Sequence, residues 1–219
     1  MRGIMMLKKL LFVICALVIG IKANASEVKK QPEVNKTSEL MKISEIKKLP
    51  EVNKTSELMK IIDQRASSRE YSNKAISDET LSEILWSAFG VNSHNTRTIP
   101  TAKNEQNLKV FVVYNNSIWQ YDGIVNTLVK VSDEDVMDYI AMQDFVRNAP
   151  LNLIYAGSDK DFSTFHAGAA AQNVSLYAAS KGLKSIVRGY INKDELKDKL
   201  RLDRDEFVII NQVIGYPEI

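Results

Sequence analysis

The segment that most constrains the fold is FHAGAAAQNVSLYAASKG, residues 165–182. Its small and apolar residues recur at helical spacing, and Gly182 stands where such a helix should end. The side chains that share one face are Ala167, Ala170, Ala171, Val174, Tyr177 and Ala178. Because most of them are small, another helix or a flat ligand can come close to this face. The segment therefore predicts a long helix with a closely approached face.

The elements around this helix are of mixed type. An amphipathic helix is predicted over 78–89, with Ser77 as its N-cap and Gly90 at its end. Further helices are predicted at 133–145 and at 193–200, the second capped by Asn192 and preceded by the segment 183–191. Strands are predicted at 108–114, 118–122, 150–158 and 206–217. A turn at 115–117 joins the first two strands into a hairpin. Helices mixed with antiparallel hairpin signals predict an α+β fold.

The N-terminus has the pattern of a secretory signal peptide. It begins with basic residues, continues with an apolar run over 10–21, and carries small residues at Ala23 and Ala25. The alternative is an N-terminal membrane anchor, but the apolar run is shorter than the ~20 residues needed to span a bilayer. We therefore expect residues 1–25 to be removed. The mature protein would be exported, periplasmic or extracellular in a bacterium, with no membrane segment.

Removal of this segment also changes the chemistry of the chain. Cys15 is the only cysteine, so the mature chain is expected to have no thiol or disulfide. Residues 1–25 contain four basic residues and no acidic ones, so the formal charge changes from +2 to −2. A nearly neutral surface gives no reason to expect nucleic acid as a partner.

Residues 26–63 form a polar arm without aromatic residues, followed by the predicted globular domain, 64–219. The sequence PEVNKTSELMKI occurs at 32–43 and again at 50–61, which is an 18-residue tandem duplication. Two copies are too few to stack into a solenoid. Each copy predicts a short helix, whose candidate N-caps are Thr37 or Ser38 and Thr55 or Ser56. A spacer is the favoured interpretation, and an arm that packs on a partner is the alternative.

No familiar catalytic spacing occurs in the chain. It lacks a nucleophile elbow, a phosphate-binding glycine loop and a metal-binding histidine pair. The chemistry, if any, must belong to a bound cofactor, so we assign no catalytic side chain and no metal. For His94 and His166, solvation or helix capping is favoured over catalysis, because neither has an evident catalytic partner.

The sequence RASSREY suits a phosphate group. Arg65, Ser67 and Arg69 stand at alternate positions, so in an extended segment or a turn they can point the same way. Two guanidinium groups and a hydroxyl are good phosphate ligands. A solvated basic stretch before a helix is the alternative, and taken alone it is favoured.

A second stretch, PTAKNEQN, suits the edge of a heteroaromatic ring. The amides of Asn104 and Gln106 can both donate and accept hydrogen bonds, although a simple turn also explains them. In IVRGY, Gly189 would let the backbone approach a planar ligand. A phosphate at one end and a ring edge with mixed donors and acceptors at the other describe flavin mononucleotide, FMN.

With these segments in order, the chain resembles the FMN-dependent nitroreductases over about 64–217. That family has an R-x-S-x-R segment, a P-S/T-A-x-N-x-Q loop leading into a strand, a GAAAQNxxLxAxxxGL helix and a final VGYP. The corresponding sequences here are RASSR, PTAKNEQNLKVFVV, GAAAQNVSLYAASKGL and VIGYP. LWSAFGVNSHNTRTIPTA and IWQYD are also similar to the branch with dehydrogenases of azoline-containing peptides. That branch continues its loop with Gly-Ala-Leu-Tyr-Pro, where this chain has KNEQN.

The resemblance implies a mostly antiparallel central sheet flanked by helices, and an intertwined homodimer with FMN in clefts between the chains. It assigns the phosphate and ribityl chain to Arg65, Ser67 and Arg69, the ring or its partner face to Thr101, Ala102, Asn104 and Gln106, and the approach to flavin N5 to the backbone around Arg188 and Gly189. Two departures stand out. Asn107-Leu108 replaces the usual Pro-Trp, and the chain stops at Ile219, where many relatives continue with a basic segment that helps bind phosphate. Because the chain lacks that basic segment after Ile219, we expect weaker FMN binding.

In this family the flavin N5 passes hydride or electrons between a small-molecule donor and an acceptor. NAD(P)H is not expected outside the inner membrane, so the donor of an exported member is another reduced carrier or the substrate itself. A dehydrogenase that oxidises its substrate fits better than a nitro-group reducer. The alternatives are a protein that binds flavin without turnover and a flavin-free envelope interaction module.

Overall fold

The computed structural model describes residues 47–218. The predicted signal peptide and the first copy of the repeat lie outside these residues. A compact unit spans Val52–Ile219 and begins before the predicted domain boundary at residue 64. In the described part of the chain, no helix combines the length and the apolar character that crossing a membrane requires.

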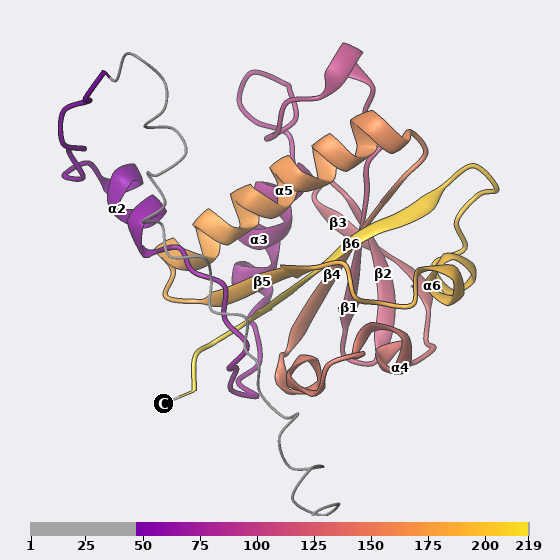
Figure 1. Ribbon diagram of the computed structural model, residues 1–219. Coiled ribbons are helices and arrows are strands. Elements are labelled where there is room, and N and C mark those ends of the chain that lie inside the picture. The colour runs from indigo at the N-terminus through magenta and orange to yellow at the C-terminus, as the bar shows by residue number, and fades with distance from the viewer. Residues whose placement is uncertain (1–46, 219) are drawn as a thin grey trace, which may run out of the picture. The chain divides into compact units, whose positions relative to one another are not determined.

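A six-stranded antiparallel sheet forms the centre of this unit (Figure 1). Its spatial order is β3-β2-β1-β4-β6-β5. The strands are β1 (Lys109–Tyr114), β2 (Ser117–Asp122), β3 (Thr127–Ser132), β4 (Leu151–Gly157), β5 (Lys184–Arg188) and β6 (Phe207–Gly215). Every residue of β4 is buried, as expected of a strand in the middle of a sheet that is covered on both faces.

Helices cover both faces of the sheet (Figure 1). They are α2 (Glu57–Gln64), α3 (Asp78–Phe89), α4 (Met137–Ile140), α5 (Lys160–Ser180) and α6 (Lys193–Lys199), with 3-10 helices at Ala102–Asn104 and Asp144–Asn148. Helices α3 and α5 share one hydrophobic core with the sheet, whereas α4, the second 3-10 helix and α6 share another. The predicted α+β fold with a mostly antiparallel sheet is confirmed.

The small-residue face of α5 is buried in the first core. Ala167, Ala170, Ala171 and Ala178 are at most 2% exposed and pack with α3 and the sheet. The Nδ2 atom of Asn173 joins α5 to α3 and to the following loop, because it donates to the carbonyl oxygens of Ser87 and Thr98, both 3.1 Å away. Of the two interpretations of this face, close packing of another helix is the one that the structure shows.

The second core corrects the prediction of a helix over 133–145. The α-helix there covers only Met137–Ile140, and the chain leaves helical geometry at Ala141 (φ −85°, ψ 51°) before the 3-10 helix Asp144–Asn148. The two short helices bury apolar residues separately: Val136 and Ile140 are fully buried at α4, and Val146 is fully buried in the 3-10 helix. Burial in this core, rather than a continuous helical period, determines the local structure.

Several other boundaries agree with the sequence. The side chains of Ser77 and Asn192 cap α3 and α6 as predicted. Strands β1 and β2 form the predicted hairpin, with Asn115 and Asn116 at positive φ in its turn. Helix α5 begins earlier than expected, because the Asp159 side chain accepts the backbone N–H groups of residues 161 and 162. Strand β3 was not predicted; it is an edge strand without a buried residue.

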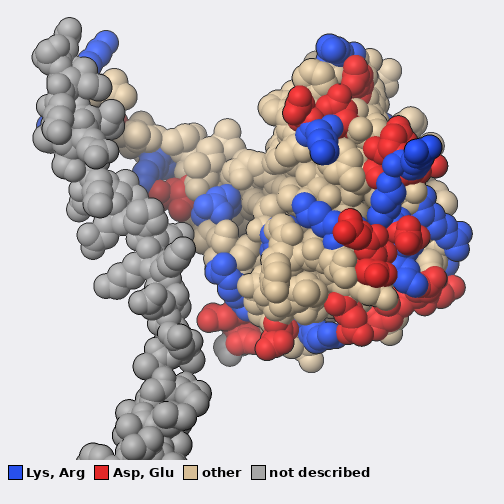
Figure 2. Space-filling model, turned by 45° about the vertical axis from the view of Figure 1, so that its right-hand side comes forward, with Lys and Arg blue, Asp and Glu red and all other residues tan. Residues whose placement is uncertain are grey.

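The second copy of the repeat forms α2. The Ser56 side chain caps it, as predicted, by accepting the N–H of Met59 at 3.4 Å. The helix has no buried residue. On the face drawn in Figure 2, acidic and basic side chains are interspersed, so neither sign of charge dominates it.

Candidate functional site

The RASSR segment lies along the outer edge of β5. It starts at Arg65, which ends α2 and takes a non-helical conformation (φ −58°, ψ 121°). Ser67 forms a parallel bridge with Ser185 of β5, and the N–H of Ser68 donates to the carbonyl of Ser185 at 3.1 Å. Beyond the bridge, Arg69 is exposed. The segment is therefore extended at this bridge, which is one of the two conformations, extended or turn, that its alternating pattern allows.

The cations of this segment are available to a ligand. Among residues 47–218, no ion pair involves Arg65 or Arg69. The guanidinium carbon of Arg69 lies 6.0 Å from the centre of the Phe145 ring. Ser67 is exposed and Arg65 is partly exposed. Two uncompensated guanidinium groups and a hydroxyl form a donor set that suits a phosphate.

Arg188 lies near this segment, but its side chain points into the protein. It is 6% exposed. Its Nη1 donates to the carbonyl oxygen of Ile140 at 3.1 Å and to Oδ1 of Asn211 at 2.9 Å, and its Nη2 donates to the carbonyl oxygen of Tyr190 at 2.9 Å. Its Nε donates to Oε1 of Gln143 at 3.2 Å. Burial lowers the pKa of this guanidinium, while Tyr71 acts in the opposite direction. Arg188 can therefore offer only its backbone to a ligand.

The backbone next to Arg188 is open. A Cβ atom built on Gly189 would meet no atom within 4 Å. The neighbouring side chains of Val187 and Tyr190 are 41% and 63% exposed. The guanidinium carbons of Arg69 and Arg188 lie 6.0 and 5.5 Å from the centre of the same Phe145 ring. The structure thus brings the RASSR segment and the Arg188-Gly189 corner together.

A hollow of about 340 Å³ lies on the other side of the RASSR segment. Gln64 and Ala66 line it, together with residues of α5 and β5 that include Ser175, Ala179 and Lys184. Arg65, Ser67 and Arg69 do not line it. The predicted phosphate ligands therefore take no part in this hollow.

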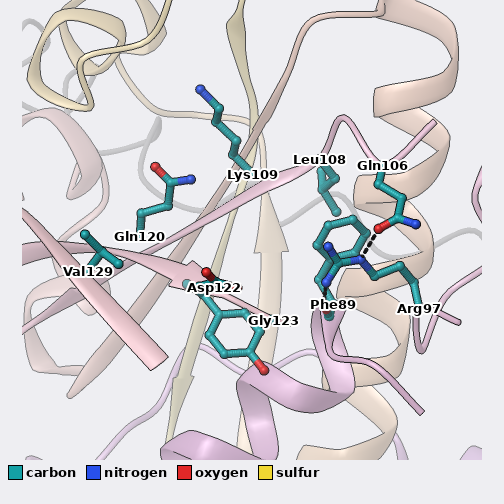
Figure 3. Close-up of a pocket in the computed structure, with 10 residues that line it drawn as sticks. Phe89, Arg97, Gln106, Leu108, Lys109, Gln120, Asp122, Gly123 and Val129 are labelled. Atoms are coloured by element: carbon teal, nitrogen blue, oxygen red, sulfur yellow. Dashed lines mark hydrogen bonds between the residues drawn. The ribbon is translucent and has the colours of Figure 1, made fainter. Parts of the chain in front are cut away.

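The second predicted part of the site is the loop before β1. Its 3-10 helix, Ala102–Asn104, contains two non-glycine residues at positive φ, Lys103 (52°) and Asn104 (58°). The Nε2 atom of Gln106 donates to Oδ1 of Asn104 at 3.3 Å, and its Oε1 accepts from Nε of Arg97 at 2.7 Å (Figure 3). The two amides expected to face a ring thus contact each other and remain exposed, while Thr101 and Ala102 are half-buried.

His166 fixes this loop to α5. Its side chain is fully buried, and its Nε2 accepts the backbone N–H of Ala102 at 2.9 Å. The other ring nitrogen, Nδ1, must then carry the proton and donate to Oδ1 of Asn107, 3.2 Å away. Burial lowers the imidazole pKa, opposed by Asp159 and Glu105, which favours this neutral form.

The sequence-based interpretation of His166 as solvated or capping missed this role. The available signal was Asn107, which stands where the pattern that this chain resembles has a proline, because a proline side chain could not accept this hydrogen bond. Leu108, which replaces the usual tryptophan, is buried with 4% exposure. His94 is exposed, in agreement with its expected solvation.

Within one chain, the two parts of the predicted site lie toward different ends of α5. The loop is attached at His166, near the start of the helix, and the RASSR segment runs beside Ala179, near its end. At a rise of 1.5 Å per residue, these positions are about 20 Å apart along the helix. The region 47–218 holds no group of three or more His, Cys, Asp or Glu side chains that could bind a metal ion.

Comparisons with known proteins agree with this fold. The sequence model of the nitroreductase family matches residues 62–216. A predicted nitroreductase of Methanocaldococcus jannaschii is 28% identical over 174 residues, which cover 69% of this chain and 87% of that protein. The crystal structure of a predicted nitroreductase from Ralstonia eutropha JMP134 is 34% identical, with a TM-score of 0.70, and the match covers 78% of this chain and 89% of that one.

A third structure shares the fold at lower identity. It is the Escherichia coli microcin synthetase McbBCD complex with truncated pro-MccB17 bound. The match has a TM-score of 0.64 at 15% identity, and covers 90% of this chain and 86% of that one. From the family match and the shared fold, this chain belongs to the nitroreductase family of oxidoreductases.

Proposed function

We propose that this protein is an exported FMN-dependent oxidoreductase that acts as a homodimer. The observation that carries the proposal is the separation of the two predicted parts of the site along α5, each with polar groups open to a ligand. The RASSR segment of one copy and the loop of a second copy would together complete each FMN site.

The phosphate end of the cofactor fits the RASSR segment. Arg65, Ser67 and Arg69 would hold the phosphate and ribityl chain, because they supply both charged and neutral hydrogen-bond donors. Within 47–218, neither arginine forms an ion pair with an acidic residue. The open backbone at Gly189 would admit a planar ring beside β5.

The ring end fits the loop before β1. Thr101, Ala102, Asn104 and Gln106 would line the ring or its partner face, with amide groups that can both donate and accept. When bound, FMN supplies hydride and electron transfer at its N5. The protein contributes position, polar contacts and exclusion of water, and none of the named side chains takes part in acid–base chemistry.

The direction of the reaction follows from the proposed location. The basic start, apolar run and small residues of 1–25 support export. Outside the inner membrane NAD(P)H is not expected, so the electron donor would be the substrate itself or another reduced carrier. Resemblance to the azoline peptide dehydrogenases supports oxidation of a small-molecule substrate over reduction of a nitro group.

The absorption spectrum of the purified protein tests the cofactor. We expect the bands of a bound flavin, or their shift when FMN is added to colourless protein. Anaerobic bleaching by candidate small-molecule donors, followed by reoxidation with an acceptor, then tests turnover. A protein that takes up no flavin would contradict the proposal. Binding without bleaching by any donor would leave only the flavin-binding alternative.

Export has a separate test. Mass spectrometry of the protein isolated from its native envelope fraction should show a chain that begins at Ser26. A protein that retains Met1, or that is held in the membrane through residues 10–21, would contradict the predicted cleavage.

A further inference from the structure

A second hollow, of about 370 Å³, opens between the loop before β1 and the β2-β3 hairpin (Figure 3). Arg97 and Gln106 line it from the loop, Gln120 and Asp122 from β2, and Phe89 from the end of α3. Its volume lies within the range of about 300–1,000 Å³ that is common for small-molecule sites. None of the predicted phosphate ligands takes part in it.

Arg97 is held in place at this hollow. Its Nε donates to Oε1 of Gln106 at 2.7 Å, and its Nη1 donates to the carbonyl oxygen of Phe89 at 3.0 Å. The guanidinium also stacks on the Phe89 ring, with its carbon 4.3 Å from the ring centre. A Cβ atom at Gly123 would lie 2.8 Å from Nη1 and 2.2 Å from that carbonyl oxygen, so only glycine admits this arrangement. The guanidinium is therefore positioned before any ligand arrives.

The charge of Arg97 lacks a carboxylate partner. In the described part of the chain, no ion pair involves Arg97. Burial lowers its pKa, and Asp122 only partly offsets this effect. The Asp122 carboxylate also lines the hollow, but it forms no ion pair with Arg97, and its Oδ1 instead accepts the N–H of Ile124 at 2.9 Å. A partly desolvated guanidinium gains most from a ligand anion, which it can hold through two parallel hydrogen bonds.

The other cation at the hollow is already compensated. Nζ of Lys109 lies 2.6 Å from Oε1 of the buried Glu206. Around Arg97, the amide of Gln120 can donate to and accept from a neutral polar group, and the Gln106 amide, which already contacts Arg97 and Asn104, keeps a second N–H and a second lone pair for it. The arrangement thus combines one anion-binding group with amide groups that match an amide of the ligand.

From this geometry we propose that the hollow binds a small carboxylate ligand of the N-acyl amino acid type. Arg97 binds the carboxylate, and Gln106 and Gln120 contact the ligand's amide. The inference goes beyond the proposed function; the hollow shares Gln106 with the proposed ring side of the FMN site and contains none of the proposed phosphate ligands.

Two probes that differ only in their terminal group, one charged and one neutral, test it on the full chain. N-acetylglycine has the carboxylate, and N-acetylglycinamide replaces it with a neutral amide. In titrations followed by NMR chemical shifts at constant ionic strength, N-acetylglycine should bind at least about ten-fold more tightly, since the charged contact is absent from the amide. The residues whose signals shift should include Gln106 and Gln120. Equal affinity for the two probes, or binding of neither, would overturn the proposal.

Variants assign the effect to Arg97. Arg97→Gln should remove the preference for the carboxylate, whereas Arg97→Lys should keep part of it, because the charge remains and the planar fork is lost. Lys130→Gln is the matched control: it removes an exposed cation of the same hairpin, which pairs with Asp133 outside the hollow. It should leave the preference unchanged. A preference that survives in Arg97→Gln, or that is lost in Lys130→Gln, would also overturn the proposal.

Discussion

The buried imidazole of His166 accepts the backbone N–H of Ala102, 2.9 Å away, across 64 residues of sequence. This contact and the hydrogen bond to Asn107 attach the loop before β1 to the start of α5. The loop contains four of the residues proposed to face the FMN ring. His166 is therefore a positioning residue for the proposed site and need not touch the cofactor itself.

Replacement of His166 by phenylalanine should destabilise the protein. The ring volume is nearly kept, but the N–H of Ala102 and Oδ1 of Asn107 lose their partner. We expect the free energy of unfolding to fall by about 1–3 kcal/mol in urea denaturation, the usual cost of unpaired polar groups. His94→Phe, at an exposed position, should change it by no more than about 0.5 kcal/mol. Equal effects of the two substitutions would contradict the anchoring role.

The same anchor should make stability depend on pH. Burial lowers the pKa of His166 in the folded protein, whereas in the unfolded chain it titrates near its ordinary value of about 6.5. As the pH falls below that value, the unfolded state takes up the proton first, so the free energy of unfolding decreases until the folded pKa is reached. Well above the unfolded value of about 6.5, the imidazole is neutral in both states and His166 adds no pH dependence. Urea denaturation from pH 7.5 to 5 should therefore show a loss that is smaller in His166→Phe; identical profiles would argue against a neutral imidazole.

Arg188 should matter for stability rather than for direct contact with a ligand. Arg188→Ala removes the donor to the buried Oδ1 of Asn211 and one of the two donors to the carbonyl oxygen of Ile140, which also accepts the N–H of Met142, so the free energy of unfolding should drop by about 2 kcal/mol or more. Lys184→Ala, at an exposed position of the same strand, is the control and should have little effect. If Arg188→Ala were as stable as the wild type, the inward hydrogen bonds would not contribute as proposed.

The sequence predicted those features that depend on local patterns. The caps at Ser77 and Asn192, the β1-β2 hairpin and the extended RASSR segment all follow from short-range rules. The prediction of one helix over 133–145 was wrong, because two separate short helices bury the apolar residues of this region in the second core. Strand β3 was missed because its burial pattern is weak and it gains its hydrogen bonds from β2 alone.

Long-range contacts of the site could not be predicted in the same way. The bond from His166 to Ala102 joins a helix to a distant loop, and nothing in either segment alone specifies the pairing. Likewise, the sequence placed the amides of Asn104 and Gln106 at a ring edge, whereas the structure shows that Gln106 also holds Arg97. A single sequence specifies donors and acceptors but leaves their partners to the tertiary fold.

The first copy of the repeat should be dispensable. Deletion of residues 32–49 keeps the second copy, and with it Ser56 and α2, which belong to the compact unit. The deleted stretch is polar and lacks aromatic residues that could anchor it. We expect an unchanged melting temperature and unchanged flavin content. A clear loss of either would mean that the arm packs on the domain or on a partner.

In the proposed site, RASSR holds the phosphate of FMN while the loop before β1 faces its ring. Arg65→Ala should weaken FMN binding by about 1.5–3 kcal/mol, because a charge-assisted contact is lost, and more strongly at low salt, where the attraction is least screened. Asn104→Ala removes only neutral hydrogen bonds, worth about 0.5–1.5 kcal/mol, and should mainly shift the reduction potential and spectrum of the flavin.

Isothermal titration of the wild type and Arg65→Ala with FMN and with riboflavin, which lacks the phosphate, is the most direct test. We expect Arg65→Ala to lose affinity for FMN and to keep its affinity for riboflavin. Equal weakening of both flavins, or a wild-type protein that binds neither, would contradict it.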